Sequence, residues 1–527
     1  MLVSQKALSL RIQNNSTNMR RKTIFPIDWV KHHPYKQAKE VDTYYANLAN
    51  RVFNVIYGSE ISYFFDDDKE TIADIAIRLT MYLEDLVSET GIWKAALAEF
   101  KKRYGTPLPF YELDDDYVEG FVNKDEVRFL LWNELQTFDG GETFINPENQ
   151  GITSVADDVF YLLDEAWETA PENERLHDFL HSEAAVHSYW EARKIVEWFS
   201  RYSYVYPGAE DDFIDIMLET KREDDTPETV DLRAYSIRVY NAFCDKHNLL
   251  SITPPQWMAR IRKPEEREMW ENFKWRHVSM LRFDDETENQ LVCKDLIHDE
   301  EFAIEKDSIN ADFLRKKLKK GDLMYCALVA YQGKWYQCGQ LACLGLDEKL
   351  QDFIDEQRHK QENIDYQSTL YPKFKEVSGG RDIIFAGSQE ELKDVYTRMG
   401  FKGMDDFKVD FEENCMVMCS PINGLVLVPD EAACVCVDYN PFYDKAYAKE
   451  NAHQFYFNDK LIDYREACDL HDHNLLPDAQ NASLKGGDYA NWFLHKNGSY
   501  IIDYCFRKNR EYDYDAKFEL AQFNPME

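Results

Sequence analysis

The chain has 527 residues, of which 97 are acidic and 61 are basic, so its formal net charge is −36. Hydrophobic residues make up 44% and aromatic residues 14% of the sequence, which excludes a disordered chain and is enough for large cores. The acidic excess excludes a generally basic protein that coats nucleic acid. No apolar run reaches the length of a transmembrane helix, so we expect a globular protein of several domains without a membrane partner.

The first half of the chain carries helical periodicity. Residues 1–18 are polar and lack helix caps, so we expect a disordered extension before a helical domain over 19–276. Apolar residues at three- and four-residue steps predict a helix over 71–86, with Asp67 placed as its cap. Pro171 suits the first turn of a long helix that we expect to reach about Ser200.

The pattern changes in the second half. Alternating residues over 277–346 predict several short antiparallel strands that form a small barrel-like domain. A charged helical linker is expected over 347–371, and 372–527 mixes strand and helix signals. In this last section, hairpin arms are expected on both sides of Asn423-Gly424, and 433–437 is expected to continue the sheet. The expected fold class is therefore α+β and multidomain, with a helical half, a barrel-like middle section and a mixed C-terminal section.

Two groups of histidines have spacings that suit metal ions. His177 and His181 would share one helix face, but the glutamate of a His-Glu-x-x-His motif is missing, so a hydrated helix face is favoured. The segment 469–478 contains four potential ligands, namely Asp469, His471, Asp472 and His473. Imidazole and carboxylate suit a divalent metal that activates water, which makes this segment the candidate metal site of a hydrolase or nuclease. The alternative is that the histidines stabilise a helix C-terminus and that no cofactor is bound.

The eleven cysteines do not form a disulfide framework. Cys415 with Cys419 and Cys434 with Cys436 alternate with apolar residues, as small side chains in buried strands do. A zinc site built from both pairs is the alternative, but zinc knuckles use Cys-x-x-Cys with polar turns. Free buried thiols predict a reducing cytoplasm as the compartment.

Two basic runs stand out from the acidic background. One is Arg315–Lys320 and the other begins at Arg20–Lys22. With the aromatic residues of the barrel section they offer a nucleic-acid surface, although helix capping is the simpler interpretation. The aromatic residues concerned are Tyr325, Tyr331, Trp335 and Tyr336.

Several segments together resemble an uncharacterised bacterial domain-of-unknown-function family that covers most of the chain from about Met19. They are FPIDWVKHHPY at 25–35, DTYYANLAN at 42–50, GDLMYCALV at 321–329, GKWY at 333–336, NPFYD at 440–444 and LPD at 476–478. The resemblance implies a bacterial intracellular protein and transfers no catalytic residue.

The sequence favours a binding or assembly protein over an enzyme, because no motif brings a nucleophile, a base and a phosphate-binding loop together. The acidic surface suits a basic protein partner. The alternative is the metal-dependent hydrolase or nuclease, in a phage-defence or toxin system of bacteria.

Overall fold

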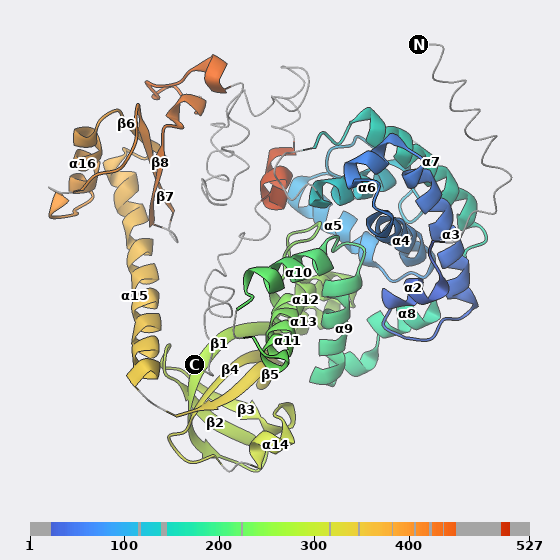
Figure 1. Cartoon of the computed structure of the whole chain (residues 1–527), viewed down its shortest axis with the longest axis horizontal. Coiled ribbons are helices and arrows are strands. Elements are labelled where there is room, and N and C mark those ends of the chain that lie inside the picture. Colours follow the sequence, from blue (N-terminus) through green and yellow to red (C-terminus); the bar gives the residue numbers. More distant parts are fainter. Residues whose placement is uncertain are drawn as a thin grey trace.

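The computed structural model has a helical first half, a closed β-barrel in the middle and a mixed α+β part after it, which confirms the predicted fold class (Figure 1). The structure describes residues 23–113, 117–138, 145–222, 225–315, 318–345, 348–381, 383–404, 407–420, 424–435, 437–448 and 497–505.

The helical half packs around α3 (Glu40–Tyr57) and α4 (Lys69–Val87), because each places apolar residues on the faces that meet. Asp68, rather than the expected Asp67, caps α4 by accepting a hydrogen bond from the Thr71 amide. The remaining helices of this half are α2 (Pro26–Lys31), α5 (Ile92–Tyr104), α6 (Lys124–Phe138), α7 (Gln150–Trp167), α8 (Glu174–Leu180), α9 (Tyr189–Tyr202), α10 (Ala209–Glu219), α11 (Pro227–Cys244), α12 (Pro254–Ile261) and α13 (Arg267–Glu271), with the 3-10 segments η1 (Glu60–Phe65), η2 (Glu183–Val186) and η3 (Pro264–Glu266).

The long helix expected after Pro171 is wrong, because the segment is divided into α8, η2 and α9. The buried guanidinium of Arg262 lies at the first break. It donates to the carbonyl oxygens of Leu180 and Ser182 at 2.6 and 3.0 Å. A continuous helix would use these carbonyl groups for its own hydrogen bonds, so their pairing with Arg262 favours the break.

The barrel closes in the strand order β1-β2-β3-β5-β4. The strands β3 and β5 pair in parallel and all the others pair antiparallel, which is the connectivity of a five-stranded Greek-key barrel of the OB type. The strands are β1 (Lys274–Glu286), β2 (Gln290–Asp295), β3 (Glu301–Glu305), β4 (Leu323–Tyr331) and β5 (Lys334–Leu344), with η4 (Lys306–Ser308) and α14 (Ala311–Leu314) between β3 and β4.

The strand β4 is almost continuously hydrophobic because both of its faces are covered. Met324, Cys326 and Leu328 point into the barrel core. Tyr325 packs outward against the first turns of α15 (Glu348–Val377), and Tyr331 packs outward against the helical half. The outer side of β4 is therefore covered by α15 and by the helical half.

The 30-residue helix α15 connects the barrel to a small sheet, as Figure 1 shows. This length corresponds to about 45 Å at 1.5 Å per residue. The sheet has the order β6-β7-β8, formed by β6 (Ile383–Ala386), β7 (Cys415–Ser420) and β8 (Gly424–Pro429), beside α16 (Gln389–Arg398). The expected fourth strand over 433–437 is wrong, because residues 432–434 form the 3-10 segment η6 (Ala432–Cys434) and the described sheet has three strands.

A C-terminal helical segment, residues 497–505, returns to the helical half. Tyr500 lies edge-on to Phe100 at 5.5 Å between ring centroids, and Tyr504 donates to the side chain of Asn133 at 2.7 Å. Ile502, from the same segment, packs in the core of the small sheet. This segment therefore contributes to two hydrophobic cores whose other residues lie far apart in the sequence.

Candidate functional site

The histidine pair predicted on one helix face lies close together, but both rings are already engaged. The ring centroids of His177 and His181 are 4.6 Å apart. His177 contacts the carbonyl oxygen of Ser88 and His181 that of Thr90, each at 3.0 Å. Burial lowers the pKa of His181, which keeps this ring neutral. The pair ties α8 to the end of α4, so both rings are held by backbone carbonyl oxygens and do not form the hydrated helix face that the sequence favours.

The candidate metal segment with Asp469, His471, Asp472 and His473 lies outside the described residues, as does Arg20–Lys22. Within the ranges that the structure describes, no group of three or more potential ligands is placed to hold a metal ion.

The cysteines of the small sheet do not converge. Cys415 and Cys419 belong to the core on one face of the sheet, whereas Cys434 belongs to the core on the other face. Cys436 is outside the described residues. Burial raises the pKa of the Cys415 thiol to about 11 and that of Cys434 to about 12. These thiols behave as core side chains, as the strand pattern predicts.

Three of the four barrel aromatics that could have stacked on bases are buried. Tyr325, Tyr331 and Tyr336 are buried, and Tyr336 stacks on Tyr189 of α9 at 4.3 Å between centroids. The outward positions of β2 and β3, the usual ligand face of OB barrels, carry no aromatic residue. The described part of the Arg315–Lys320 run follows α14 in the loop before β4. These three tyrosines therefore pack between the barrel and its neighbours, whereas Trp335 is half-buried and lies edge-on to Phe302 of the barrel core at 4.9 Å between ring centroids.

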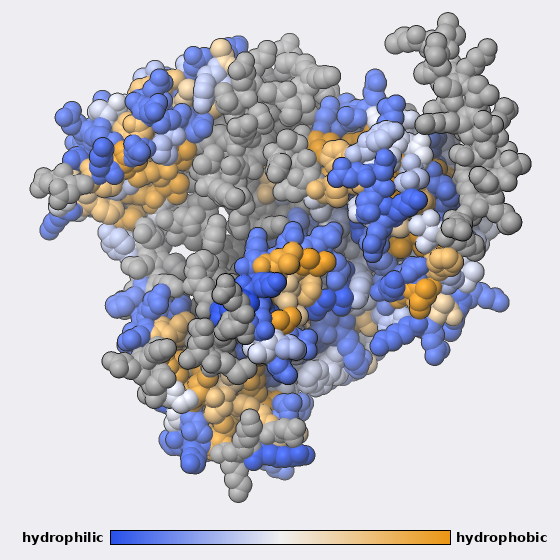
Figure 2. Space-filling model, viewed as in Figure 1, coloured by the Kyte–Doolittle hydropathy of each residue, from blue (hydrophilic) through white to orange (hydrophobic). Residues whose placement is uncertain are grey.

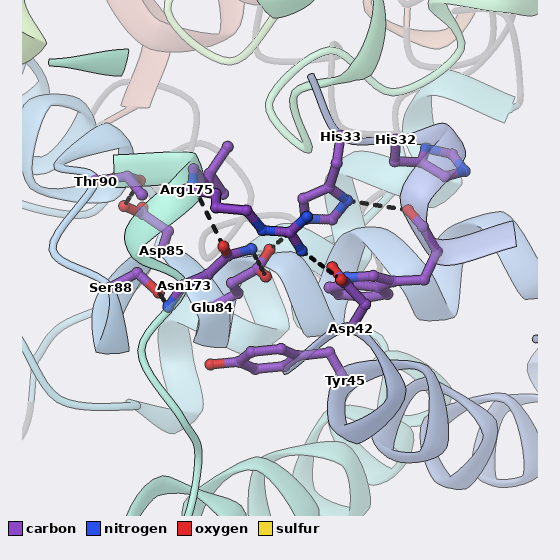
Figure 3. A network of polar contacts seen from close by, with 12 residues as sticks. His32, His33, Asp42, Tyr45, Glu84, Asp85, Ser88, Thr90, Asn173 and Arg175 are labelled. Atoms are coloured by element: carbon purple, nitrogen blue, oxygen red, sulfur yellow. Dashed lines mark hydrogen bonds and ion pairs between the residues drawn. The ribbon is translucent and has the colours of Figure 1, made fainter. Parts of the chain in front are cut away.

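A buried polar network connects α2, α3, α4 and α8 (Figure 3). The carboxylate of Glu84, which is completely buried, accepts from His33 Nε2 and from Asn173 Nδ2, each at 2.8 Å. Arg175 donates to the buried carboxylate of Asp42, which also accepts from the Tyr35 hydroxyl at 2.9 Å. These contacts join four helices through one chain of polar atoms.

The charges and hydrogen bonds of this network stabilise one another, as in a structural element. Burial acts to lower the pKa of His33, but the charge of Glu84 and hydrogen bonds to Glu84 and to the Trp29 carbonyl outweigh burial and raise it. Both ring nitrogens of His33 are occupied by protein oxygens, at 3.0 Å for Nδ1 and 2.8 Å for Nε2. Because the central groups of the network are buried and paired, we interpret it as a structural element that holds the helices of this core together.

The helix α10 presents the clearest binding surface. None of its residues is buried, although it carries several large apolar side chains. Ile214 and Leu218, one turn apart, are 50% and 63% exposed. The outward face also carries Asp211, Asp215 and Glu219, which are all exposed. Figure 2 shows a hydrophobic patch with a hydrophilic border in the region of α10.

The opposite side of α10 is held by cations. The Arg238 guanidinium lies over the Phe213 ring at 4.0 Å, and Arg238 donates to Glu210 at 3.2 Å. The helix itself contains acidic residues and no lysine or arginine. The outward face is therefore both apolar and strongly acidic.

This acidic and apolar face, defined by Asp211, Ile214, Asp215, Leu218 and Glu219, was not singled out from the sequence. The sequence signal is the acidic pair Asp211-Asp212, which also suits a loop between helices. The segment with amphipathic spacing of apolar residues is too short to show which side of the helix faces solvent. The structure is needed to show that Ile214 and Leu218 stay exposed.

Fold and surface together define a multidomain α+β protein with a closed barrel and an exposed acidic and apolar helix. None of the described helices is both long and apolar enough to span a bilayer. The chain belongs to the family described as Protein of unknown function (DUF3843), whose pattern matches residues 23–333 and 340–507. This membership confirms the resemblance to a domain-of-unknown-function family. Among curated proteins and solved structures, none matches the chain.

Proposed function

We propose that this protein is a binding protein that recruits a basic, amphipathic segment of another protein through the outward face of α10. The observation that carries the proposal is the exposure of Ile214 and Leu218 between exposed carboxylates. No ion pair joins Asp215 or Glu219 to the described residues, so both are available to a partner. A segment with leucines and lysines on one face would cover the apolar pair and meet the acidic residues.

The size of the face argues for a transient interface. Full burial of an exposed leucine or isoleucine contributes about 1.5–3 kcal/mol, and these two side chains begin about half-exposed. Exposed ion pairs add roughly 0.2–1 kcal/mol each. After the cost of association, a dissociation constant in the micromolar range is expected. The formal net charge of −36 supports attraction of a cationic partner and a salt-dependent rate of association.

The free thiols support a reducing compartment such as the cytoplasm as the place of action. The cysteines of the described residues are all free, and those in the barrel and the small sheet are largely buried. Disulfides would be expected in a secreted protein of this cysteine content.

The test uses a fluorescent 14-residue peptide of leucine and lysine with helical amphipathic spacing, and a peptide of the same composition in scrambled order. Fluorescence anisotropy should show that the wild type binds the amphipathic peptide more tightly than the scrambled one. The double variant Ile214→Ser, Leu218→Ser should weaken binding at least tenfold, because it removes both apolar contacts.

The matched control is Ile27→Ser, which removes another exposed isoleucine, 59% exposed, on α2. This variant should bind as the wild type does. Equal affinity of the wild type and the α10 double variant would refute the proposal, as would equal affinity for the two peptides.

A further inference from the structure

A second candidate site lies between the helical half and the barrel. A pocket of about 600 Å³ is lined by residues of α9, α11, η4 and β5. This volume falls in the range of small-ligand pockets. Its aromatic walls are Trp190 of α9 and Tyr235 of α11, which are 41% and 43% exposed.

An irregularity in β5 shapes the floor of the pocket. The pairing of β4 with β5 shifts between Cys338 and Leu341, so Gly339 and Gln340 form a bulge. Gly339 has a φ of +75°, and an added Cβ would approach Val239 of α11 to 3.7 Å. A glycine therefore allows the bulge to form where the strand passes close to the helix.

The polar groups of the pocket include two acceptors on Gln337 and Asp307, beside the hydroxyl of Ser308 and the amide side chains of Asn310 and Gln340. Gln337 is 8% exposed, and its amide nitrogen is used to donate to the carbonyl oxygen of Gly339 at 2.8 Å. Its side-chain oxygen receives no hydrogen bond from the described residues and remains an acceptor. The exposed carboxylate of Asp307 has no ion pair within the described part of the chain. The pocket lining contains no lysine or arginine.

The aromatic walls are already arranged around a cation. The guanidinium of Arg193 lies 5.6 Å from the Trp190 ring centroid and donates to the Tyr235 hydroxyl at 2.9 Å. Arg193 is itself neutralised by Glu197 at 2.6 Å and is only 7% exposed. Arg193 therefore helps to fix both aromatic side chains, whose exposed parts stay available to a ligand.

We propose that this pocket binds an aliphatic cation, meaning an ammonium or guanidinium group on a short hydrocarbon stem. Such groups only donate hydrogen bonds, and the pocket offers acceptors and a carboxylate for them. The stem would pack on Trp190 and on the apolar side chains of Leu232 and Leu341. Anionic ligands are disfavoured because the lining contains the exposed carboxylate of Asp307 and no lysine or arginine. The cation comes either from a free diamine or from a lysine side chain of a peptide.

The test is a calorimetric titration of the full-length chain with 1,5-diaminopentane, with a five-residue peptide that carries one central lysine, and with the same peptide acetylated on that lysine. At least one of the two cationic probes should bind, and the acetylated peptide should not. Tighter binding of the diamine identifies a free amine as the source, and tighter binding of the lysine peptide identifies a protein segment.

Asp307→Asn should weaken binding of the preferred probe roughly fivefold, because it removes the charge and keeps the shape. Trp190→Ala should weaken it by about threefold or more. The matched control Glu301→Gln changes an exposed carboxylate on β3 outside the pocket and should leave the affinity unchanged.

The α10 double variant should also keep the affinity of the pocket, so this inference stands or fails separately from the proposed function. Absence of binding by both cationic probes at 10 mM would overturn it. Equal binding of the acetylated peptide, or an unchanged affinity in a folded Asp307→Asn variant, would do the same.

Discussion

Replacement of Glu84 by glutamine tests whether the buried network is held by charge. In the structure, one oxygen of Glu84 accepts from His33 and the other from Asn173, each at 2.8 Å, with the carboxylate fully buried. A glutamine at this position can keep the geometry of both hydrogen bonds. Its amide nitrogen can donate to a neutral His33, whose other ring nitrogen donates to the Trp29 carbonyl oxygen. The substitution thus removes the charge with little change in packing.

The expected effect depends on pH. Because the folded-state pKa of His33 is raised above its usual value of 6.5, the His33–Glu84 pair stabilises the fold fully below about pH 6.5. That contribution is lost as the pH rises through the folded pKa. Between the two pKa values, the advantage of the wild type over Glu84→Gln should shrink by up to about 1.4 kcal/mol per pH unit. For a helical region of this size, this corresponds to about 3 °C in the unfolding midpoint per pH unit.

The assay is thermal unfolding of the wild type and of Glu84→Gln from pH 5.5 to 9, followed by circular dichroism at 222 nm. The control is Glu165→Gln, which removes the charge of an exposed carboxylate that pairs with Arg51 at the surface. A difference between wild type and Glu84→Gln that stays constant over the whole pH range would refute the assignment of His33 and Glu84 as a charged pair. A Glu84→Ala variant should be destabilised by about 3–5 kcal/mol, because His33 and Asn173 lose their partner.

Three other changes are expected to lower stability. Arg78→Met should destabilise the fold by about 3–5 kcal/mol in denaturant unfolding, because it leaves the buried Glu134, which it binds through two 2.7 Å contacts, without its cation; a loss below 1 kcal/mol would contradict this. Tyr500→Ala should cost about 3–5 kcal/mol and accelerate hydrogen exchange in residues 497–505, since the buried ring packs in the helical core; unchanged exchange would show that this segment does not depend on the core. Gly333→Ala should lower the free energy of unfolding by about 1–2 kcal/mol, because Gly333 has a φ of +73° in the β4–β5 turn. The control Gly345→Ala, at a glycine without positive φ, should be close to neutral. Equal unfolding midpoints for the two variants would argue against the turn geometry.

Two elements of the structure carry strong local signals in the sequence. The turn between Tyr331 and Lys334 joins β4 and β5 through Gln332 and Gly333, both with positive φ. Ser388 caps α16 by accepting from the Glu391 amide at 3.3 Å. In both cases the residues that decide the structure are neighbours in the sequence, which is why the pattern suffices.

The predictions that were wrong depend on residues that are distant in the sequence. The break after α8 is favoured by Arg262, which lies 80 or more residues downstream of the carbonyl groups that it binds. The strand β3 was not foreseen, because its five residues are too few for a clear alternation. Residues 497–505 pack on the helical core through contacts such as that of Tyr500 with Phe100, and no local sequence pattern predicts such contacts.

The candidate binding surfaces were the least predictable part. The sequence drew attention to histidines and cysteines, whereas in the described residues these groups are bonded to carbonyl oxygens or packed in cores. A binding face is defined by what remains exposed after packing, and Ile214 and Leu218 look like core residues in the sequence. Exposure follows from the tertiary structure, so it could not be predicted from local spacing.

Hydrogen–deuterium exchange of the wild type with and without the amphipathic leucine–lysine peptide tests the central proposal most directly. Binding at the outward face of α10 should slow exchange of the amides in residues 209–219, and raising the salt concentration should remove this protection. The double variant at Ile214 and Leu218 should show no protection. Protection confined to other elements, or protection of α10 that persists in the double variant, would contradict the account.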